Sequence, residues 1–176
     1  MLTSSFIDYS DQVSRETRSL FDLNKNDETR QTIAENWGGS PEMLAVPEQI
    51  HSTKISCVDR AGHFTGTDGL LTDNPEIILS LKIADCVAVY LCEIRSHIIG
   101  LLHSGWKGTV DNIVPNAIQL MRKMGANRKE IKVFMGPAIG ICCYEVDEEI
   151  AEKFDDEAKI KLEKGKWKVG LHQQIS

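Results

Sequence analysis

Two apolar runs separated by a short polar connection constrain the fold of this chain more than any other feature. Residues Val87–Cys92 and Ile98–Leu102 have the character of buried strands. The connection Glu93–His97 is short enough for a hairpin. A further apolar run, Ile77–Leu79, predicts a buried strand upstream. The middle of the chain is therefore predicted to form a β-sheet.

Helical periodicity begins after the second of these runs. One stripe of apolar residues recurs at helical spacing: Val110, Ile113, Val114, Ala117, Ile118 and Met121. Pro115 lies inside this pattern, so we expect either a kink or a later start of the helix. Gly125 is a natural stop, and Ile131–Met135 returns to strand character. Strands and helices are thus mixed along the chain.

Two further helices are predicted nearer the ends of the chain. Asp27 is a candidate N-cap for a helix over residues 28–37. Val146, Ile150 and Phe154 recur at the spacing of an amphipathic helix. The charged residues around them have both signs, which is typical of a solvated helix face and loop. We therefore assign no chemistry to these charges.

Composition and charge restrict the class of protein. A chain of 176 residues with 41% hydrophobic residues can bury one core, so we expect residues 1–176 to form a single domain. A net charge of −6 argues against nonspecific nucleic-acid binding, which needs a basic face. No apolar run approaches the ~20 residues that cross a bilayer, so we expect no membrane partner. Five cysteines without framework spacing, and no signal-peptide pattern at the N-terminus, predict reduced thiols in a cytoplasmic protein.

Three residues at the borders of these elements have side chains that ligate metals. Cys86 precedes the first apolar run, His103 follows the second, and His51 lies upstream of both. If they converge, two imidazoles and a thiolate form a site for a borderline-soft divalent metal with one open position. Taken singly, each has an ordinary explanation: an isolated histidine is more often a loop or core residue, and a buried cysteine is usually inert.

Neighbouring residues are candidates for other roles. In an extended segment the Asp85 side chain points away from that of Cys86, so Asp85 is suited to orient a neighbour or a substrate. Ser104 and Gly105 follow a strand-like run at the expected start of a helix, where backbone N–H groups suit anion binding. A tight strand-to-helix connection with a buried Trp106 explains the same residues without a ligand.

Several short motifs occur in one order along the chain. They are Gln-x-His at 49–51, Thr-Asp-Gly-Leu-Leu-Thr at 67–72, Ala-Asp-Cys at 84–86, His-Ser-Gly-Trp-Lys-Gly at 103–108 and Gly-Pro-Ala-Ile-Gly-x-Cys-Cys-Tyr-Glu-Val at 136–146. Together they resemble the laccase-domain (polyphenol oxidase-like) proteins, a family of purine nucleoside phosphorylases. The resemblance covers roughly Pro47 to Phe154.

This resemblance implies a fold, a metal and an activity. The fold is α+β, with two mixed β-sheets packed face to face and flanking helices (α/β/β/α). The metal ligands fall on His51, Cys86 and His103, and the expected metal is zinc. The implied activities are phosphorolysis of adenosine, inosine, guanosine and methylthioadenosine, and deamination of adenosine. Members of the family also continue beyond the position of residue 176 with a C-terminal segment that is absent here.

The expected catalytic set is Cys86, His103, His51 and Asp85. Asp85 is our candidate for moving protons during deamination, with bound zinc lowering the pKa of a water molecule. For phosphorolysis, Lys107 and the backbone N–H groups near Ser104 and Gly105 are the candidates for holding phosphate. Lys107 stands where the resembled family has arginine, so it offers a point charge in place of a bidentate contact.

Other functions use the same residues. A multicopper centre needs many histidines, commonly in His-x-His pairs, whereas this chain has five histidines and no such pair. Binding of a single copper ion by His51, Cys86 and His103 is a first alternative. A cysteine hydrolase with Cys86 as nucleophile, His103 as base and Asp85 or Gln49 as orienting residue is a second alternative. A non-catalytic binding domain is a third, and the sequence leaves homo-oligomerisation open.

Overall fold

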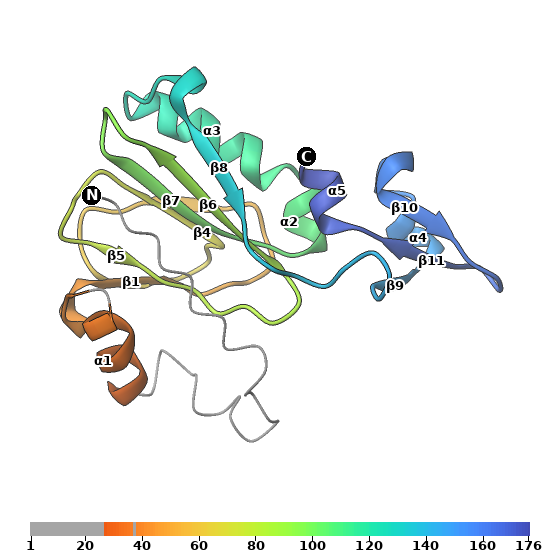
Figure 1. The fold of residues 1–176 in the computed structure, drawn as a ribbon, viewed down its shortest axis with the longest axis horizontal. Coiled ribbons are helices and arrows are strands. Elements are labelled where there is room, and N and C mark those ends of the chain that lie inside the picture. The colour runs from red at the N-terminus through yellow and green to blue at the C-terminus, as the bar shows by residue number, and fades with distance from the viewer. Residues whose placement is uncertain (1–26, 37) are drawn as a thin grey trace.

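The structure, a computed structural model, describes residues 27–36 and 38–176, and a five-stranded sheet lies at the centre of this part of the chain (Figure 1). Its strand order is β2-β4-β7-β6-β8. The bounds are β2 (Ile55–Cys57), β4 (Gly69–Thr72), β6 (Val87–Glu93), β7 (Ile98–Ser104) and β8 (Lys132–Met135). The β2–β4 pair is parallel and the other pairs are antiparallel, so the sheet is mixed.

The described residues also contain two smaller sheets, five α-helices and three short 3-10 helices, which span Pro41–Met43, Arg128–Glu130 and Asp156–Ala158. The first sheet is parallel, in the order β3-β1-β5, with β1 (Leu44–Pro47), β3 (Gly62–Phe64) and β5 (Ile78–Leu79). The second is antiparallel, in the order β10-β11-β9, with β9 (Glu145–Asp147), β10 (Lys159–Lys161) and β11 (Lys166–Val169). The helices are α1 (Asp27–Asn36), α2 (Trp106–Val110), α3 (Ile113–Lys123), α4 (Glu148–Ala151) and α5 (Leu171–Ile175).

Alternating side chains on two strands arrange these elements in layers. On β4, Leu71 packs in the cluster that contains the buried face of α3, and Leu70 packs against Ala45 of β1. On β1, the residues on either side of Ala45 point the other way, toward Ala34 of α1. Successive residues of a strand face opposite sides of a sheet, so each strand joins two layers. The order is α1, parallel sheet, five-stranded sheet, α3, as Figure 1 shows.

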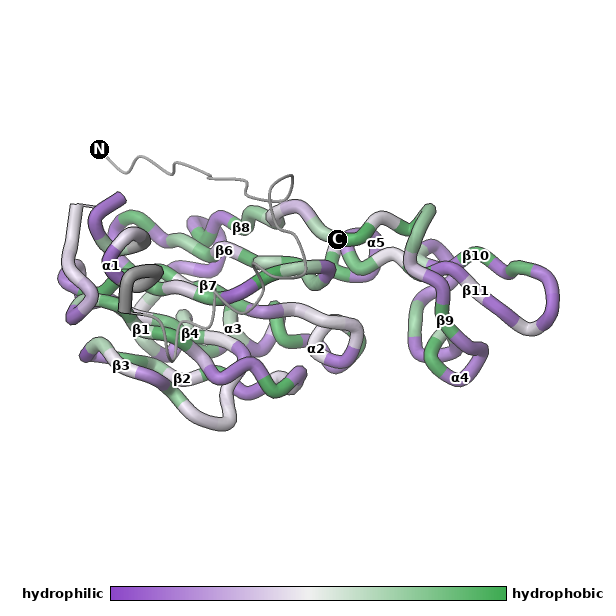
Figure 2. Tube along the Cα trace, turned by 90° about the horizontal axis from the view of Figure 1, so that it is seen from below, coloured by the Kyte–Doolittle hydropathy of each residue, from purple (hydrophilic) through white to green (hydrophobic). Residues whose placement is uncertain are grey.

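The layered α+β fold confirms the expected class, and the sheets differ from the expectation in type and number. We expected two mixed sheets, whereas the structure has three sheets. Only the five-stranded sheet is mixed: the β3-β1-β5 sheet is wholly parallel and the β10-β11-β9 sheet is wholly antiparallel. The sheet β9–β11, with α4 and α5, lies to one side of the layers and has a hydrophilic tip between β10 and β11 (Figure 2). None of the described helices is long and apolar enough to span a membrane.

Most predicted elements are present, and their differences have local causes. The expected hairpin is the antiparallel β6–β7 pair. Of the two expectations for Pro115, the later helix start is correct, since α3 begins at Ile113. Pro115 lies in the first turn of α3, where a backbone N–H has no acceptor within the helix, so the N–H that proline lacks is not needed there. Within the described residues, helix α1 spans Asp27–Asn36, so Asp27 is itself helical. Its predicted last residue, Trp37, lies outside the described residues.

The helix predicted from Val146, Ile150 and Phe154 is wrong in extent. Only Glu148–Ala151 is helical, and Val146 lies on strand β9. All three side chains still pack against the same core, so the apolar spacing reflects burial of a strand, a single helical turn and a loop. The charged stretch around them accordingly includes two further strands, β10 and β11, where we expected a helix face and loop.

Candidate metal centre

The β6–β7 hairpin brings Cys86 and His103 together. Its register pairs Ala88 with His103 and Val87 with Ser104, so Cys86 lies at the same end of the hairpin as His103. The loop between β1 and β2 adds His51. One ligand atom from each of these three residues lies within 4.8 Å of the other two. The rings of the two histidines are 4.8 Å apart between centroids and nearly perpendicular, at 81°.

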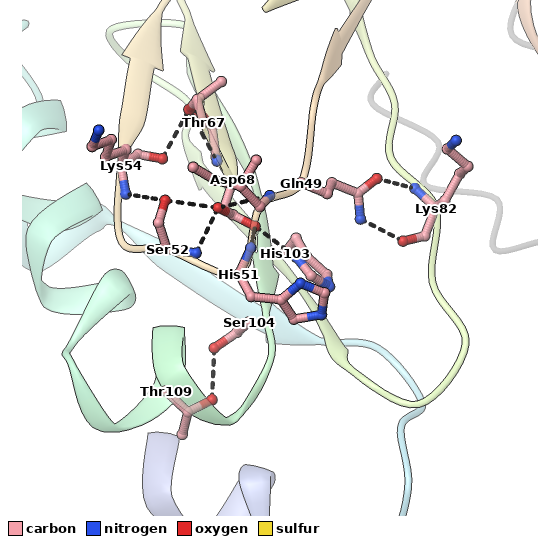
Figure 3. A network of polar contacts seen from close by, with 12 residues as sticks. Gln49, His51, Ser52, Lys54, Thr67, Asp68, Lys82, His103, Ser104 and Thr109 are labelled. Carbon is pink, nitrogen blue, oxygen red and sulfur yellow. Dashed lines mark hydrogen bonds and ion pairs between the residues drawn. The ribbon is translucent and has the colours of Figure 1, made fainter. Parts of the chain in front are cut away.

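A buried carboxylate, Asp68, holds both histidines in place (Figure 3). The Nδ1 atom of His103 lies 2.9 Å from Asp68 Oδ1. The same carboxylate accepts the backbone N–H of His51 at 2.8 Å, and the backbone N–H and hydroxyl of Ser52 at 2.7 Å each. Metal-ligating histidines commonly donate their second ring N–H to a carboxylate, which fixes the tautomer and the ring orientation. Asp68 therefore makes His103 Nε2 the atom available to a metal.

The charge state of this pair follows from its surroundings. Burial would raise the pKa of Asp68, but the hydrogen bonds from His103, Ser52 and His51 outweigh it and hold this pKa below its ordinary value. Burial lowers the pKa of His103, although Asp68 acts in the opposite direction. The site therefore combines an ionised carboxylate with a neutral imidazole, which is the form of histidine that binds metals.

Sequence reasoning assigned no role to Asp68. It lies in the motif at 67–72, directly before a strand whose residues are all buried. An aspartate with 0% exposure must have its hydrogen-bonding capacity met inside the protein. An acidic residue between Thr67 and Gly69 at the start of an apolar strand was the signal that could have indicated it.

Gly105 provides the space for the cluster. A Cβ atom at this position would lie 3.0 Å from the Cys86 Sγ and 3.0 Å from Cδ2 of the His51 ring. The φ angle of Gly105 is −77°, a value that any residue adopts, so the backbone does not require glycine here. Glycine is favoured here because the side chains of Cys86 and His51 approach this position closely.

The geometry and the donor set fit a tetrahedral zinc ion. Three atoms no more than 4.8 Å apart have a common centre within about 2.8 Å of each, and small side-chain rotations shorten this to the 2.0–2.3 Å of Zn–N and Zn–S bonds. Burial, then the charges of Asp85 and Asp68, raise the pKa of the Cys86 thiol. A thiolate in this environment is favoured only when a cation shares it. The same environment does not favour Cys86 as the free thiolate nucleophile of a hydrolase.

The other predicted site residues lie around this cluster. Asp85 is exposed, and its carbonyl accepts the N–H of Ile139 at 3.0 Å, which places the 136–144 loop beside the site. Lys107 is exposed on the first turn of α2, with Nζ 5.5 Å from the centroid of Trp106. Ser104 is buried, and its hydroxyl forms a hydrogen bond with the hydroxyl of Thr109 at 2.8 Å. The Ser104 side chain is therefore already engaged, which leaves its backbone as the candidate for binding an anion.

Most of the chain also matches a known protein family. The family described as multi-copper polyphenol oxidoreductase laccase matches residues 21–176. The chain belongs to this family. Among the residues that the structure describes, His51, Cys86 and His103 form the sole group of three metal-ligating side chains.

Relatives of this laccase-family chain include proteins named as an adenosine deaminase and a purine nucleoside phosphorylase. Adenosine deaminase RL5, from an unknown prokaryotic organism, is 31% identical over 72% of this chain and 52% of its own length. Purine nucleoside phosphorylase YlmD of Geobacillus stearothermophilus is 33% identical over 70% of this chain and 52% of its own length. The chain thus spans about half the length of these curated relatives.

The fold is shared with a solved structure. The Bacillus licheniformis hypothetical protein YfiH superposes with a TM-score of 0.81 at 30% identity, over 87% of this chain and 64% of that one. The layered fold of this chain is therefore that of its family.

Proposed function

We propose that this chain carries the zinc centre of a purine nucleoside phosphorylase that also deaminates adenosine. The observation that carries the proposal is the convergence of His51, Cys86 and His103 within 4.8 Å, with Asp68 bonded to His103. The names of the relatives support the reaction class, since they include a purine nucleoside phosphorylase and an adenosine deaminase. The substrates in this proposal are adenosine, inosine, guanosine, methylthioadenosine and phosphate.

The three ligands leave one position of a tetrahedral ion open to a reactant. When bound, zinc supplies Lewis acidity and lowers the pKa of a coordinated water. The residues of the chain set the geometry: Asp68 orients His103, and Gly105 leaves room for the side chains of His51 and Cys86.

In phosphorolysis, a phosphate oxygen forms a bond to C1′ of the nucleoside while the bond from C1′ to the base nitrogen breaks. The products are the free purine, which takes a proton, and ribose 1-phosphate, or 5-methylthioribose 1-phosphate where the substrate is methylthioadenosine. We assign phosphate binding to Lys107 and to the backbone N–H groups near Ser104 and Gly105. Support comes from the exposed Lys107 ammonium, which lies 5.5 Å from the centroid of the Trp106 ring and is four residues along the chain from His103.

In deamination, water replaces the 6-amino group of adenosine and ammonia leaves, so a group must move protons between them. We assign this role to Asp85. It is exposed to solvent, and its charge is close enough to raise the pKa of Cys86 after the larger effect of burial. We place this chemistry in the cytoplasm, in keeping with five cysteines that are all unpaired.

The test is turnover of the zinc-loaded protein with adenosine, with and without phosphate, followed by chromatography. Adenine formed only with phosphate reports phosphorolysis, and inosine formed without phosphate reports deamination. The Cys86→Ala variant is the control for the metal centre, and Cys57→Ala is the matched control, because Cys57 is an exposed cysteine outside the cluster. Equal turnover by the wild-type and Cys86→Ala proteins would defeat the proposal.

A single-copper phenol oxidase is the second candidate. Two imidazoles and one thiolate are also the ligand set of mononuclear copper sites, and the family description names copper. Copper-loaded protein that oxidises a phenol with molecular oxygen, alongside zinc-loaded protein inert toward adenosine, would favour this candidate.

A further inference from the structure

The side chain of Gln49 forms a two-point bridge to the backbone of Lys82 (Figure 3). Its Nε2 donates to the Lys82 carbonyl at 2.7 Å, and its Oε1 accepts the Lys82 N–H at 2.9 Å. A single amide thus meets both backbone hydrogen-bonding groups of a residue 33 positions away. A long-range contact of this kind fixes two segments relative to each other.

The two bridged segments carry different ligands of the metal centre. Gln49 lies two residues before His51, and Lys82 lies four residues before Cys86. The backbone N–H of Gln49 also donates to the Thr67 carbonyl at 3.0 Å, directly beside Asp68. Gln49 therefore connects the loop of His51, the loop of Cys86 and the segment that leads into Asp68.

The backbone around Gln49 shows that this arrangement is imposed by contacts. Gln49 has a φ of +65° and His51 a φ of +58°, both in the left-handed region that glycine tolerates best. Such conformations persist when surrounding interactions determine them, and they gather at functional sites. The bonds to Lys82 and Thr67 supply these interactions at Gln49, while Asp68 supplies them at His51.

We infer that Gln49 is a positioning residue for the metal centre: by holding the Cys86 loop against the His51 loop, it sets the affinity for zinc. This inference rests on the proposed function, because it takes zinc as the ion that the site holds. Gln49 itself ligates nothing. It acts on the distance between the thiolate and the imidazole.

The chemistry of the bridge requires a glutamine. Glutamate has the same length and accepts from the Lys82 N–H, but it cannot donate and would put a charged oxygen against the Lys82 carbonyl. Methionine has a similar length and volume and forms neither hydrogen bond. The variants Gln49→Glu and Gln49→Met therefore remove one or both contacts with little change of shape.

The chain offers a matched control at Gln174. Its Oε1 accepts the Asp155 N–H at 2.8 Å and its Nε2 donates to Asp155 Oδ2 at 3.0 Å, so it forms a similar two-point bridge outside the cluster. Zinc dissociation constants for wild type, Gln49→Met, Gln49→Glu and Gln174→Met are measured by competition with a chromogenic chelator. Thermal unfolding of the metal-free proteins measures the general structural role.

We expect Gln49→Met and Gln49→Glu to bind zinc at least about tenfold more weakly than wild type, the usual effect of losing a residue that positions ligands. Gln174→Met should keep the wild-type zinc affinity while its unfolding temperature falls. Equal zinc affinity in wild type and both Gln49 variants would overturn the inference, as would failure of both Gln49 variants to fold without metal. Wild-type protein that does not bind zinc would instead defeat the proposed function.

Discussion

His103 and Asp68 share a buried hydrogen bond of 2.9 Å, and it determines which ring nitrogen of His103 can ligate a metal. The ionised carboxylate only accepts, so Nδ1 must donate and Nε2 carries the lone pair. Because Asp68 also accepts the backbone N–H of His51, one side chain orients two of the three candidate ligands.

We expect Asp68→Asn to weaken zinc binding by roughly 10–100-fold, since the amide cannot accept all the hydrogen bonds that the carboxylate accepts. Competition with a chelator measures this effect. Asp73→Asn, at an exposed aspartate just after β4, is the control. Unchanged zinc affinity in a folded Asp68→Asn protein would contradict this role.

Gly105→Ala should separate folding from metal binding. The backbone of Gly105 accommodates alanine, so we expect the metal-free protein to fold as before. The new Cβ would lie 3.0 Å from the Cys86 Sγ and from the His51 ring, so zinc affinity should fall by an order of magnitude or more. Gly140→Ala, where the nearest atom is 3.4 Å away, is the matched control. If Gly105→Ala kept the wild-type zinc affinity, the new Cβ would not displace the side chains of Cys86 and His51, and this prediction would be wrong.

Lys107→Met should raise the KM for phosphate. We expect an increase of about tenfold, which corresponds to a loss of about 1.4 kcal/mol in the free energy of phosphate binding. Steady-state kinetics at saturating adenosine measure it. Lys123→Met, at an exposed lysine of α3, should leave this KM unchanged. An unaltered KM in Lys107→Met would eliminate the assignment.

The turn of the β6–β7 hairpin should show a pH-dependent contribution to stability. Glu93 accepts the hydroxyl and N–H of Ser96 and the N–H of Arg95, and these hydrogen bonds hold its pKa below the ordinary value. A carboxyl with a lower pKa in the folded state stabilises the fold above the unfolded pKa of about 4.3, and this contribution is lost as pH falls through the folded pKa. Glu93→Gln should therefore unfold at a lower temperature than wild type at neutral pH.

The same difference should shrink as the pH is lowered past the folded pKa of Glu93. Thermal unfolding of both proteins across this range measures it, and Glu149→Gln is the control at an exposed glutamate. A difference that persists unchanged into acid would show that the charge of Glu93 is not what fixes the turn.

Zinc should stabilise the folded protein by mass action. At a free zinc concentration of about 100 times the dissociation constant, the free energy of unfolding should rise by about 2.7 kcal/mol, and a chelator should reverse this. Calorimetry with and without zinc measures the shift. The same zinc concentration should leave His103→Ala nearly unaffected, and an equal shift in that variant would place the ion elsewhere.

Much of the local structure followed from the sequence because it depends on neighbours in the chain. The apolar runs that became β6 and β7, and their short connection, predicted the hairpin correctly. A hairpin places the residue before its first strand near the last residues of its second strand, and His103 is the last but one residue of β7. The proximity of Cys86 and His103 was therefore already encoded in the strand pattern, although we predicted the site from residue types and motifs.

The helix predicted over Val146, Ile150 and Phe154 shows where local patterns fail. Apolar residues four apart are equally compatible with a long helix and with a strand, a turn and a loop that share one core. Pairing of β9 with β11 decided the outcome, and those strands are about 20 residues apart in sequence.

By itself, the sequence determined the mixture of strands and helices, the hairpin and the types of donor atom available to a metal, because these depend on side-chain chemistry and on contacts close along the chain. Only the tertiary structure decided how close His51 lies to the other two ligands, that Asp68 bonds to both the His103 ring and the His51 backbone, and that Gln49 bridges the two ligand loops. Those relationships join residues 17 to 52 positions apart, and loop backbones with positive φ at Gln49 and His51 form only when distant partners stabilise them.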